Sequence, residues 1–137
     1  MTIPRVFIDS NIPMYVAGRD HVNREPARRF LARVRSAEVD ACTSTEALQE
    51  ILFRYVGLKR LDLARSIYDL FVQLCPTVLP VTLADTDRAR DLITVGSRAS
   101  VRDALHAAVM LNNGITLVAT FDTGFDTIPG VERIPLT

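Results

Sequence analysis

At 137 residues the chain has the length of a single domain, and with 48% hydrophobic and 23% charged residues it has an ordinary globular composition. This excludes a disordered chain and a low-complexity chain. Sixteen Lys and Arg residues balance sixteen Asp and Glu residues, so no overall field would recruit a nucleic acid or a membrane. Attraction to a nucleic acid would therefore need local patches or a bound metal.

Targeting and cross-linking signals are absent from the sequence. Cys42 and Cys75 form neither a metal-ligand spacing nor a disulfide framework. The first apolar run ends at Asp9, which is unlike a signal peptide. No apolar stretch approaches the ~20 residues that a membrane span needs. We therefore expect a cytoplasmic protein with no membrane segment and with one domain over residues 1–137.

The predicted elements alternate along the chain. Short β-like runs predict strands at residues 6–8, 39–42, 78–81, 115–120 and 131–134. Helical signals predict helices at 25–36, 43–56, 62–75, 84–94 and 100–113, followed by a tight turn at 122–125. Thr43 with Glu46, and Ser100 with Asp103, have the spacing of helix-capping boxes. The alternation predicts an α/β fold with three α/β/α layers and a central, mostly parallel sheet of about five short strands.

The predicted helix at 62–75 has an unusually wide apolar surface. Eight apolar residues span roughly 200° of its helical wheel, whereas a helix buried on one side needs a stripe of ~100°. Burial between two neighbours within the chain would explain this width. An exposed groove or dimer face that accepts a partner helix would also explain it, and we favour this second interpretation.

Four carboxylates are candidates for a site at the carboxyl ends of the predicted strands, where ligands bind in open parallel sheets. Asp9 directly follows the first strand, and Asp122 comes two residues after the strand at 115–120. Glu50 lies beside the apolar arc of its predicted helix, and Asp103 lies in the first turn of another helix. Four acids from four elements would then converge at one rim.

Such a cluster implies a bound cation, because carboxylates this close raise one another's pKa and destabilise the fold when all are ionised. Hard oxygen ligands without a Cys or His cluster suit Mg²⁺ or Mn²⁺ rather than Zn²⁺. The matching chemistry is phosphodiester hydrolysis.

Each acid also has a purely structural explanation. Asp103 is the carboxylate that a capping box after Ser100 requires, and Asp9 and Asn11 could cap a helix after the first strand. Glu50 could be a rim residue with a packed stem, and Asp122 could be a turn residue. The number of acids and their placement at strand ends favour a site.

Four runs carrying these acids resemble, in order, the four motifs of PIN domains. They are VFIDSNIPMY at 6–15, STEALQEI at 44–51, RDALHAA at 102–108 and TFDTGFD at 120–126. They span nearly the whole chain, and its length and layout resemble a VapC-type toxin of a bacterial type II toxin–antitoxin pair. The resemblance implies a Mg²⁺- or Mn²⁺-dependent endoribonuclease that hydrolyses RNA, forms a homodimer and is held inactive by a cognate antitoxin protein.

The resemblance also implies roles for individual residues. Asp9, Glu50 and Asp103 would hold the principal metal, and Asp122 would complete the ligand set or position water. Asn11 and Thr120 would orient the carboxylates through hydrogen bonds. Asp126 is a weaker candidate for the same role, near Gly124, where some PIN domains carry a further acid.

Four more residues lie near the motif acids. Arg98 and Arg102 flank Asp103 in sequence and are candidates to bind substrate phosphate. His106 follows Asp103 by one helical turn, and we expect it to be a structural hydrogen-bonding residue. Ser10 is expected to be a turn hydroxyl.

A second hypothesis of a different class is a catalytically inactive PIN-like module that only binds a protein partner. It would keep the fold and the partner surface but lack effective metal binding. Gly124 is the feature in its favour, and the presence of all four acids argues against it.

Overall fold

The computed structural model describes residues 2–137 and has five strands in one sheet. The strands are β1 (Arg5–Ile8), β2 (Asp40–Ser44), β3 (Thr77–Leu79), β4 (Leu117–Ala119) and β5 (Glu132–Arg133). All four strand pairings are parallel, and the spatial order is β3-β2-β1-β4-β5. The predicted sheet is therefore confirmed.

Six α-helices connect the strands in the described residues. They are α1 (Asn11–Ala17), α2 (Arg24–Arg35), α3 (Thr45–Gly57), α4 (Leu61–Leu74), α5 (Leu83–Leu92) and α6 (Val101–Asn112). A 3₁₀ turn, η1 (Thr123–Thr127), follows β4 where the tight turn was predicted. None of these helices has the length and apolar character needed to cross a membrane.

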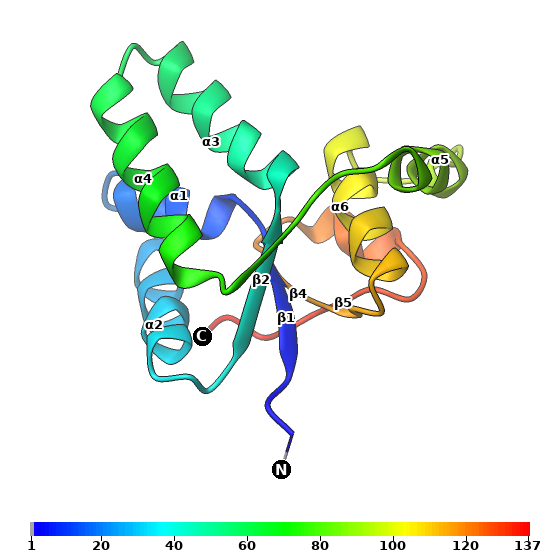
Figure 1. Ribbon diagram of the computed structural model, residues 1–137, viewed down its shortest axis with the longest axis horizontal. Coiled ribbons are helices and arrows are strands. Elements are labelled where there is room, and N and C mark those ends of the chain that lie inside the picture. Colours follow the sequence, from blue (N-terminus) through cyan, green and yellow to red (C-terminus); the bar gives the residue numbers. More distant parts are fainter. Residues whose placement is uncertain (1) are drawn as a thin grey trace.

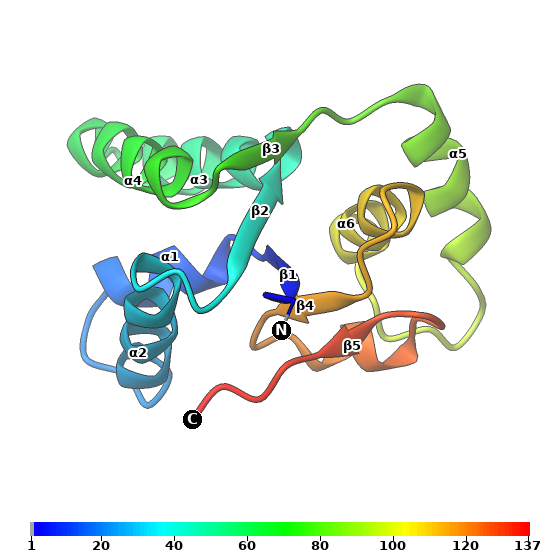
Figure 2. The same cartoon turned by 60° about the horizontal axis from the view of Figure 1, so that its bottom comes forward.

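The sheet separates two layers of helices, as Figures 1 and 2 show. Successive side chains of a strand point to opposite faces. Accordingly, Val6 and Ile8 pack with α1, α2, α3 and α4, whereas Phe7 packs with α6 and η1. Helix α5 lies outside α6, with Ala89 packed against Ala104 and Ala108. This is the predicted three-layer α/β/α arrangement.

The sheet topology has a switch point at the carboxyl end of β1, where a ligand crevice is expected. From β1 the chain moves outward through β2 to β3 on one side, and it later returns to β4 and β5 on the other side. The order of strands therefore reverses between β1 and β4. In open α/β sheets such a reversal is where ligands bind, because the crossover helices diverge there. Asp9 and Thr120 directly follow these two strands.

The start of α3 differs from the prediction by one residue. Thr43 does not cap the helix: it continues β2 and donates through Oγ1 to the Ile8 backbone oxygen at 2.9 Å. Ser44 is the cap, and its Oγ accepts from the Ala47 backbone N at 3.3 Å. Ser is the somewhat better helix cap of the two. In addition, Thr43 pairs with Val78 of β3 and uses its hydroxyl to contact Ile8 of β1, so the cap falls on Ser44.

Most of the wide apolar arc on α4 is covered within the chain. Ala64, Ile67 and Phe71 are buried against α3, α1 and α2. The exposed apolar side chains that remain are Leu61 and Val72, with Leu58 in the preceding loop. Burial between neighbours therefore accounts for the centre of the arc. Leu58, Leu61 and Val72 stay exposed, and a partner face over them remains a prediction.

Candidate active site

Asp9 is the centre of a buried hydrogen-bond network at the end of β1. Its backbone N donates to the Ala119 oxygen at 3.0 Å, which continues the pairing of β1 with β4. Its Oδ1 accepts from the Ser10 backbone N at 2.7 Å, and its Oδ2 accepts from Thr120 Oγ1 at 2.7 Å. The carboxylate is thus held by groups of both central strands.

Thr120 also joins Asp9 to two other predicted residues. While its single hydroxyl hydrogen goes to Asp9, its oxygen accepts from Asn11 Nδ2 at 3.1 Å and from the Asp122 backbone N at 3.0 Å. The hydroxyl group therefore uses its donor and both acceptor positions. Asn11 and Thr120 have the hydrogen-bond geometry of residues that orient the carboxylates.

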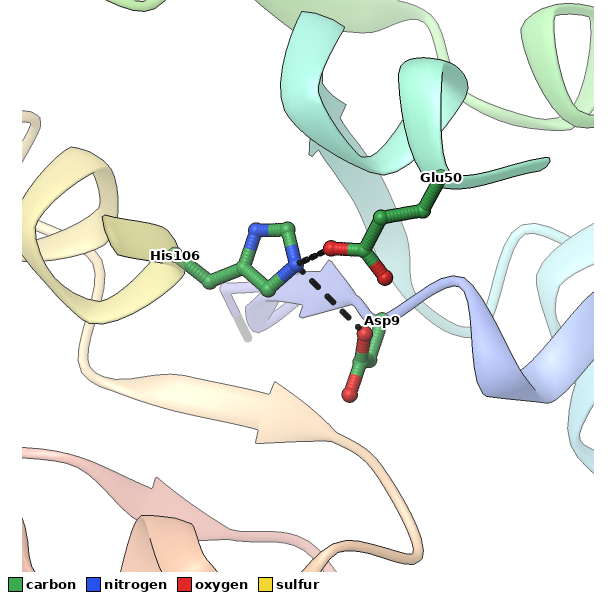
Figure 3. Close-up of side chains that lie close together, drawn as sticks. All are labelled: Asp9, Glu50 and His106. Atoms are coloured by element: carbon green, nitrogen blue, oxygen red, sulfur yellow. Dashed lines mark hydrogen bonds and ion pairs between the residues drawn. The ribbon is translucent and has the colours of Figure 1, made fainter. Parts of the chain in front are cut away.

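Glu50 and His106 meet Asp9 from the two helices that border the crevice (Figure 3). Glu50 projects from α3, and its Oε1 lies 2.6 Å from Nε2 of the fully buried His106 on α6. The same nitrogen is 3.7 Å from Asp9 Oδ1. Ser10 Oγ donates to Glu50 Oε2 at 2.6 Å. One ligand atom from each of Asp9, Glu50 and His106 lies within 4.8 Å of the others.

Asp103 and Asp122 form the second half of the site. Asp103 is buried in the first turn of α6, and its backbone N donates to Ser100 Oγ at 3.0 Å, as the predicted cap requires. Asp122 caps η1, and its Oδ1 accepts from the Gly124 backbone N at 2.8 Å. The two carboxyls lie close enough for each to shift the pKa of the other. Asp103 Oδ2 is buried and has no donor among the protein groups of residues 2–137.

Burial and mutual repulsion shift the pKa values of these acids. Burial, the interaction with Asp122 and the charge of Asp9 together raise the pKa of Asp103 to about 8. The interaction with Asp103 lowers the pKa of Asp122, so within this pair Asp103 is the acid that holds a proton more readily. Burial also raises the pKa of Asp9. Two of the four acids thus resist ionisation in the metal-free protein, which indicates a shortage of positive charge.

His106 supplies part of that charge. Burial alone would lower its pKa, but the hydrogen bond to Glu50 and the charge of Asp9 outweigh burial and raise it. For Glu50, burial favours the neutral acid, but the contacts with His106 and Ser10 prevail and lower its pKa. His106 Nδ1 is buried without a partner among the described residues, so the proton-bearing nitrogen that faces the carboxylates is Nε2.

The donor set fits a divalent cation. Four carboxylates from four different parts of the chain could supply oxygen ligands: Asp9, Glu50, Asp103 and Asp122. The buried Oδ2 of Asp103 has no hydrogen-bond donor among the described residues, and a cation would take the place of that donor. Mg²⁺ and Mn²⁺ prefer such oxygen ligands. A cation would relieve the repulsion that raises the pKa of Asp103 and Asp9.

The other predicted residues lie around this centre. Asp126 does not join it: its two carboxylate oxygens accept from Arg133 at 2.8 and 3.0 Å. This ion pair, with a contribution from the exposed Arg98, lowers the pKa of Asp126. Arg102 is exposed beside Asp103, and its charge contributes to the lowered pKa of Glu50. The structure therefore places Arg102 nearer the acids than Asp126.

Gly124 leaves no room for a further acid. A Cβ at this position would meet the Arg98 backbone oxygen at 2.9 Å and Asp122 Oδ1 at 3.0 Å. Any side chain here would therefore force the turn after β4 to shift. The loop that leads into α6 has taken the space that an acidic side chain would need.

Sequence reasoning underestimated two residues. Ser10 is not merely a turn hydroxyl, because it donates to Glu50, 40 positions along the chain. His106 does form hydrogen bonds, but it forms them to the acids themselves. The available signal for His106 was its position three residues after Asp103, which places both side chains on one face of α6.

Comparisons with known proteins agree with this geometry. The PIN domain family profile matches residues 6–131. Ribonuclease VapC13 of Mycobacterium tuberculosis is 40% identical over 129 residues, which cover 94% of this chain and 98% of that protein.

Solved structures of similar fold include the M. tuberculosis VapC20 toxin, described as cleaving the sarcin–ricin loop. It superposes with a TM-score of 0.72 at 20% identity, over 88% of this chain and 92% of that chain. A toxin–antitoxin complex from Klebsiella pneumoniae superposes with a TM-score of 0.66 at 19% identity, over 93% of this chain and 95% of that chain.

Proposed function

The chain belongs to the PIN domain family, and from this premise we propose that it is a Mg²⁺- or Mn²⁺-dependent endoribonuclease toxin restrained by a cognate antitoxin. The observation that carries the proposal is that Asp9 and Glu50 meet at the end of β1, while Asp103, whose pKa is raised in part by the charge of Asp9, has one oxygen buried and unpartnered among the described residues. The ribonuclease name of the VapC13 relative supports the reaction class. The toxin–antitoxin complex of similar fold supports the kind of partner.

In this proposal Asp9, Glu50 and Asp103 hold the metal, and Asp122 completes the ligand set. When bound, Mg²⁺ or Mn²⁺ supplies orientation and activation of water and offsets negative charge on the phosphate. In the overall hydrolysis, the hydroxyl of water adds to phosphorus, the bond from phosphorus to one bridging oxygen breaks, and that oxygen leaves with the remaining proton of the water.

The remaining polar groups position the ligands and the substrate. Ser10 fixes Glu50 Oε2 and Thr120 fixes Asp9 Oδ2, which leaves Glu50 Oε1 and Asp9 Oδ1 directed toward His106 Nε2. His106 keeps Glu50 and Asp9 together by presenting a proton on Nε2 between them. Arg98 and Arg102, both exposed, bind the substrate phosphates that flank the cleaved bond.

The proposal also covers the domain organisation, the oligomeric state and the cellular location of the protein. We propose that residues 1–137 form one functional domain, that the active form is a homodimer, and that it acts on RNA in the cytoplasm. The exposed apolar residues Leu58, Leu61 and Val72 near α4 are available for protein contacts. RNA access then depends on whether the antitoxin is bound.

The test is cleavage of total cellular RNA by purified, antitoxin-free protein. We expect discrete fragments with Mg²⁺ or Mn²⁺ and none with a chelator. Asp9→Asn and Asp103→Asn should abolish the fragments, because each removes one charged ligand. Glu46→Gln, one turn before Glu50 on α3, is the matched control and should cleave like the wild type.

One combination of results would contradict the proposal. The folded wild type would leave RNA intact under all conditions, and calorimetry would detect no binding of Mg²⁺ or Mn²⁺. The protein would then be a PIN-like module that binds a partner without catalysis. In that case Gly124, which excludes a further acid, would explain the missing metal.

A further inference from the structure

An exposed aromatic ring lies beside the candidate site. Phe53 is 62% exposed on α3, three residues after Glu50, so both side chains project from the same side of the helix. The Arg102 guanidinium carbon lies 5.1 Å from the centre of the Phe53 ring. Arg102 belongs to the first turn of α6, next to Asp103.

The Phe53–Arg102 pair spans the crevice. Helices α3 and α6 lie on opposite sides of the point where β1 and β2 end (Figure 1). Glu50 and His106 contact each other across this gap from the same two helices (Figure 3). Phe53 and Arg102 repeat that contact one turn further along α3, toward solvent. The exposed ring and the guanidinium therefore lie on the solvent side of the Glu50–His106 contact.

The exposed position of Phe53 is better explained by binding of a nucleic acid than by a contribution to the stability of the fold. Packing leaves more than half of the ring exposed, so burial contributes little to retaining an aromatic residue here. The positive charge of Arg102 acts on Glu50 across the crevice. A flat apolar face and a guanidinium next to metal-binding acids provide the two features that bind single-stranded RNA, stacking on bases and attraction to phosphates.

We propose that Phe53 is a stacking platform for a nucleobase of the RNA next to the cleaved bond, while Arg102 binds the adjoining phosphate. This rests on the proposed ribonuclease function and adds a substrate class to it. A base can reach the ring only if it is out of its helix, so the substrate is unpaired at this nucleotide. Phe53 thereby selects single-stranded loops or ends over duplex RNA.

The experiment uses the absence of tryptophan from the chain. Phe53→Trp keeps a stacking face and introduces a single fluorophore at the platform. Val56→Trp introduces the same fluorophore one turn further along α3, at a position that is 54% exposed. Both are made in an Asp103→Asn background, which prevents cleavage. The probe is an unstructured oligoribonucleotide of mixed sequence, added alone or annealed to its complement.

We expect the single strand to quench the Phe53→Trp emission, the duplex to leave it nearly unchanged, and Val56→Trp to respond to neither. In the otherwise native chain, Phe53→Leu should raise KM for single-stranded RNA about tenfold with little change in kcat, because stacking contributes binding and not chemistry. Since Phe53 is exposed, Phe53→Leu should unfold at the wild-type temperature.

Several results would overturn the inference. Equal quenching of both Trp variants, or equal quenching by single strand and duplex, would show that the ring does not select an unpaired base. An unchanged KM for Phe53→Leu would do the same. If Phe53→Leu instead converts a dimer into a monomer, Phe53 belongs to an interface between copies of the chain.

These failures can be separated from failure of the proposed function. If the wild type cleaves RNA and Phe53→Leu cleaves it equally well, only the stacking role is lost. If the wild type never cleaves RNA, the enzyme proposal fails, and the fluorescence comparison still reports whether Phe53 contacts a base.

Discussion

Asp103→Asn should make the stability of the metal-free protein fall less as pH rises from 3.8 to about 8. The folded protein holds a proton on Asp103 up to a pH of about 8, whereas in the unfolded chain the carboxyl releases it near its ordinary value of 3.8. The folded state therefore binds more protons than the unfolded state between these values, and this contribution to stability falls as pH rises through them. Asparagine keeps the shape of the side chain and does not titrate.

The size of the effect follows from the pKa. Each pKa unit corresponds to about 1.4 kcal/mol, so a shift from 3.8 to about 8 sets an upper limit of about 6 kcal/mol. Screening by water and neighbouring groups reduces this, and we expect on the order of 2–3 kcal/mol. For a domain of this size, that corresponds to a difference of about 10 °C in Tm.

The assay is thermal unfolding by circular dichroism in the presence of a chelator, from about pH 5 to about pH 8. The Tm of the wild type should fall relative to that of Asp103→Asn as pH rises. Asp69→Asn, an exposed acid on α4, is the control and should follow the wild type. His106 and Asp9, whose pKa values are also raised, contribute a decline to all three proteins, so the measured quantity is the difference between them. The charge of Asp103 helps to raise the pKa of His106, so the His106 contribution is smaller in Asp103→Asn and adds to the expected difference. Parallel curves for wild type and Asp103→Asn would refute the assignment of the buried proton to Asp103.

Two further substitutions test the support of the site. Ser10→Ala should lower the free energy of unfolding by about 1–2 kcal/mol, because Glu50 loses a hydrogen-bond donor at 2.6 Å. Urea unfolding measures this change, and an unchanged midpoint would mean that water replaces the hydroxyl. Gly124→Ala should cost about 1–3 kcal/mol, because the new Cβ would meet the Arg98 backbone oxygen at 2.9 Å; a wild-type urea midpoint would show that the turn yields without strain.

Local sequence signals predicted the fold and the position of most elements. The apolar run at 6–8 and the alternation of short strands with helices were sufficient for a parallel sheet between helices. The cap at Ser100 was correct because its hydrogen bond from the Asp103 backbone N lies within one turn of chain. The carboxylate of Asp103 was expected to complete a capping box, but the bond found there is only the one to the Ser100 hydroxyl. The cap of α3 was predicted one residue too early, at Thr43. The Thr43 hydroxyl instead donates to the Ile8 backbone oxygen at the end of β1, which is distant in sequence.

In the candidate site too, some features were predicted from local sequence and others depended on contacts between distant parts of the chain. Placement at strand ends and in PIN-like motifs selected Asp9, Glu50, Asp103 and Asp122 as candidates. The structure brings Asp9 and Glu50 together with His106, and Asp103 and Asp122 form a separate pair that the charge of Asp9 reaches. Their assignment as metal ligands stays a prediction. The pairing of Asp126 with Arg133 was not visible in the sequence, since it depends on how η1 lies against β5.

The sequence by itself determined the α/β class, the parallel sheet and the identity of the acids, because strand and helix periodicities and caps are local properties of the chain. Only the tertiary structure decided which group faces which acid. Ser10 and His106 reach Glu50 from positions 40 and 56 residues away. Contacts at such separations depend on how two helices cross the end of a sheet, and burial at that crossing sets which carboxyls keep a proton.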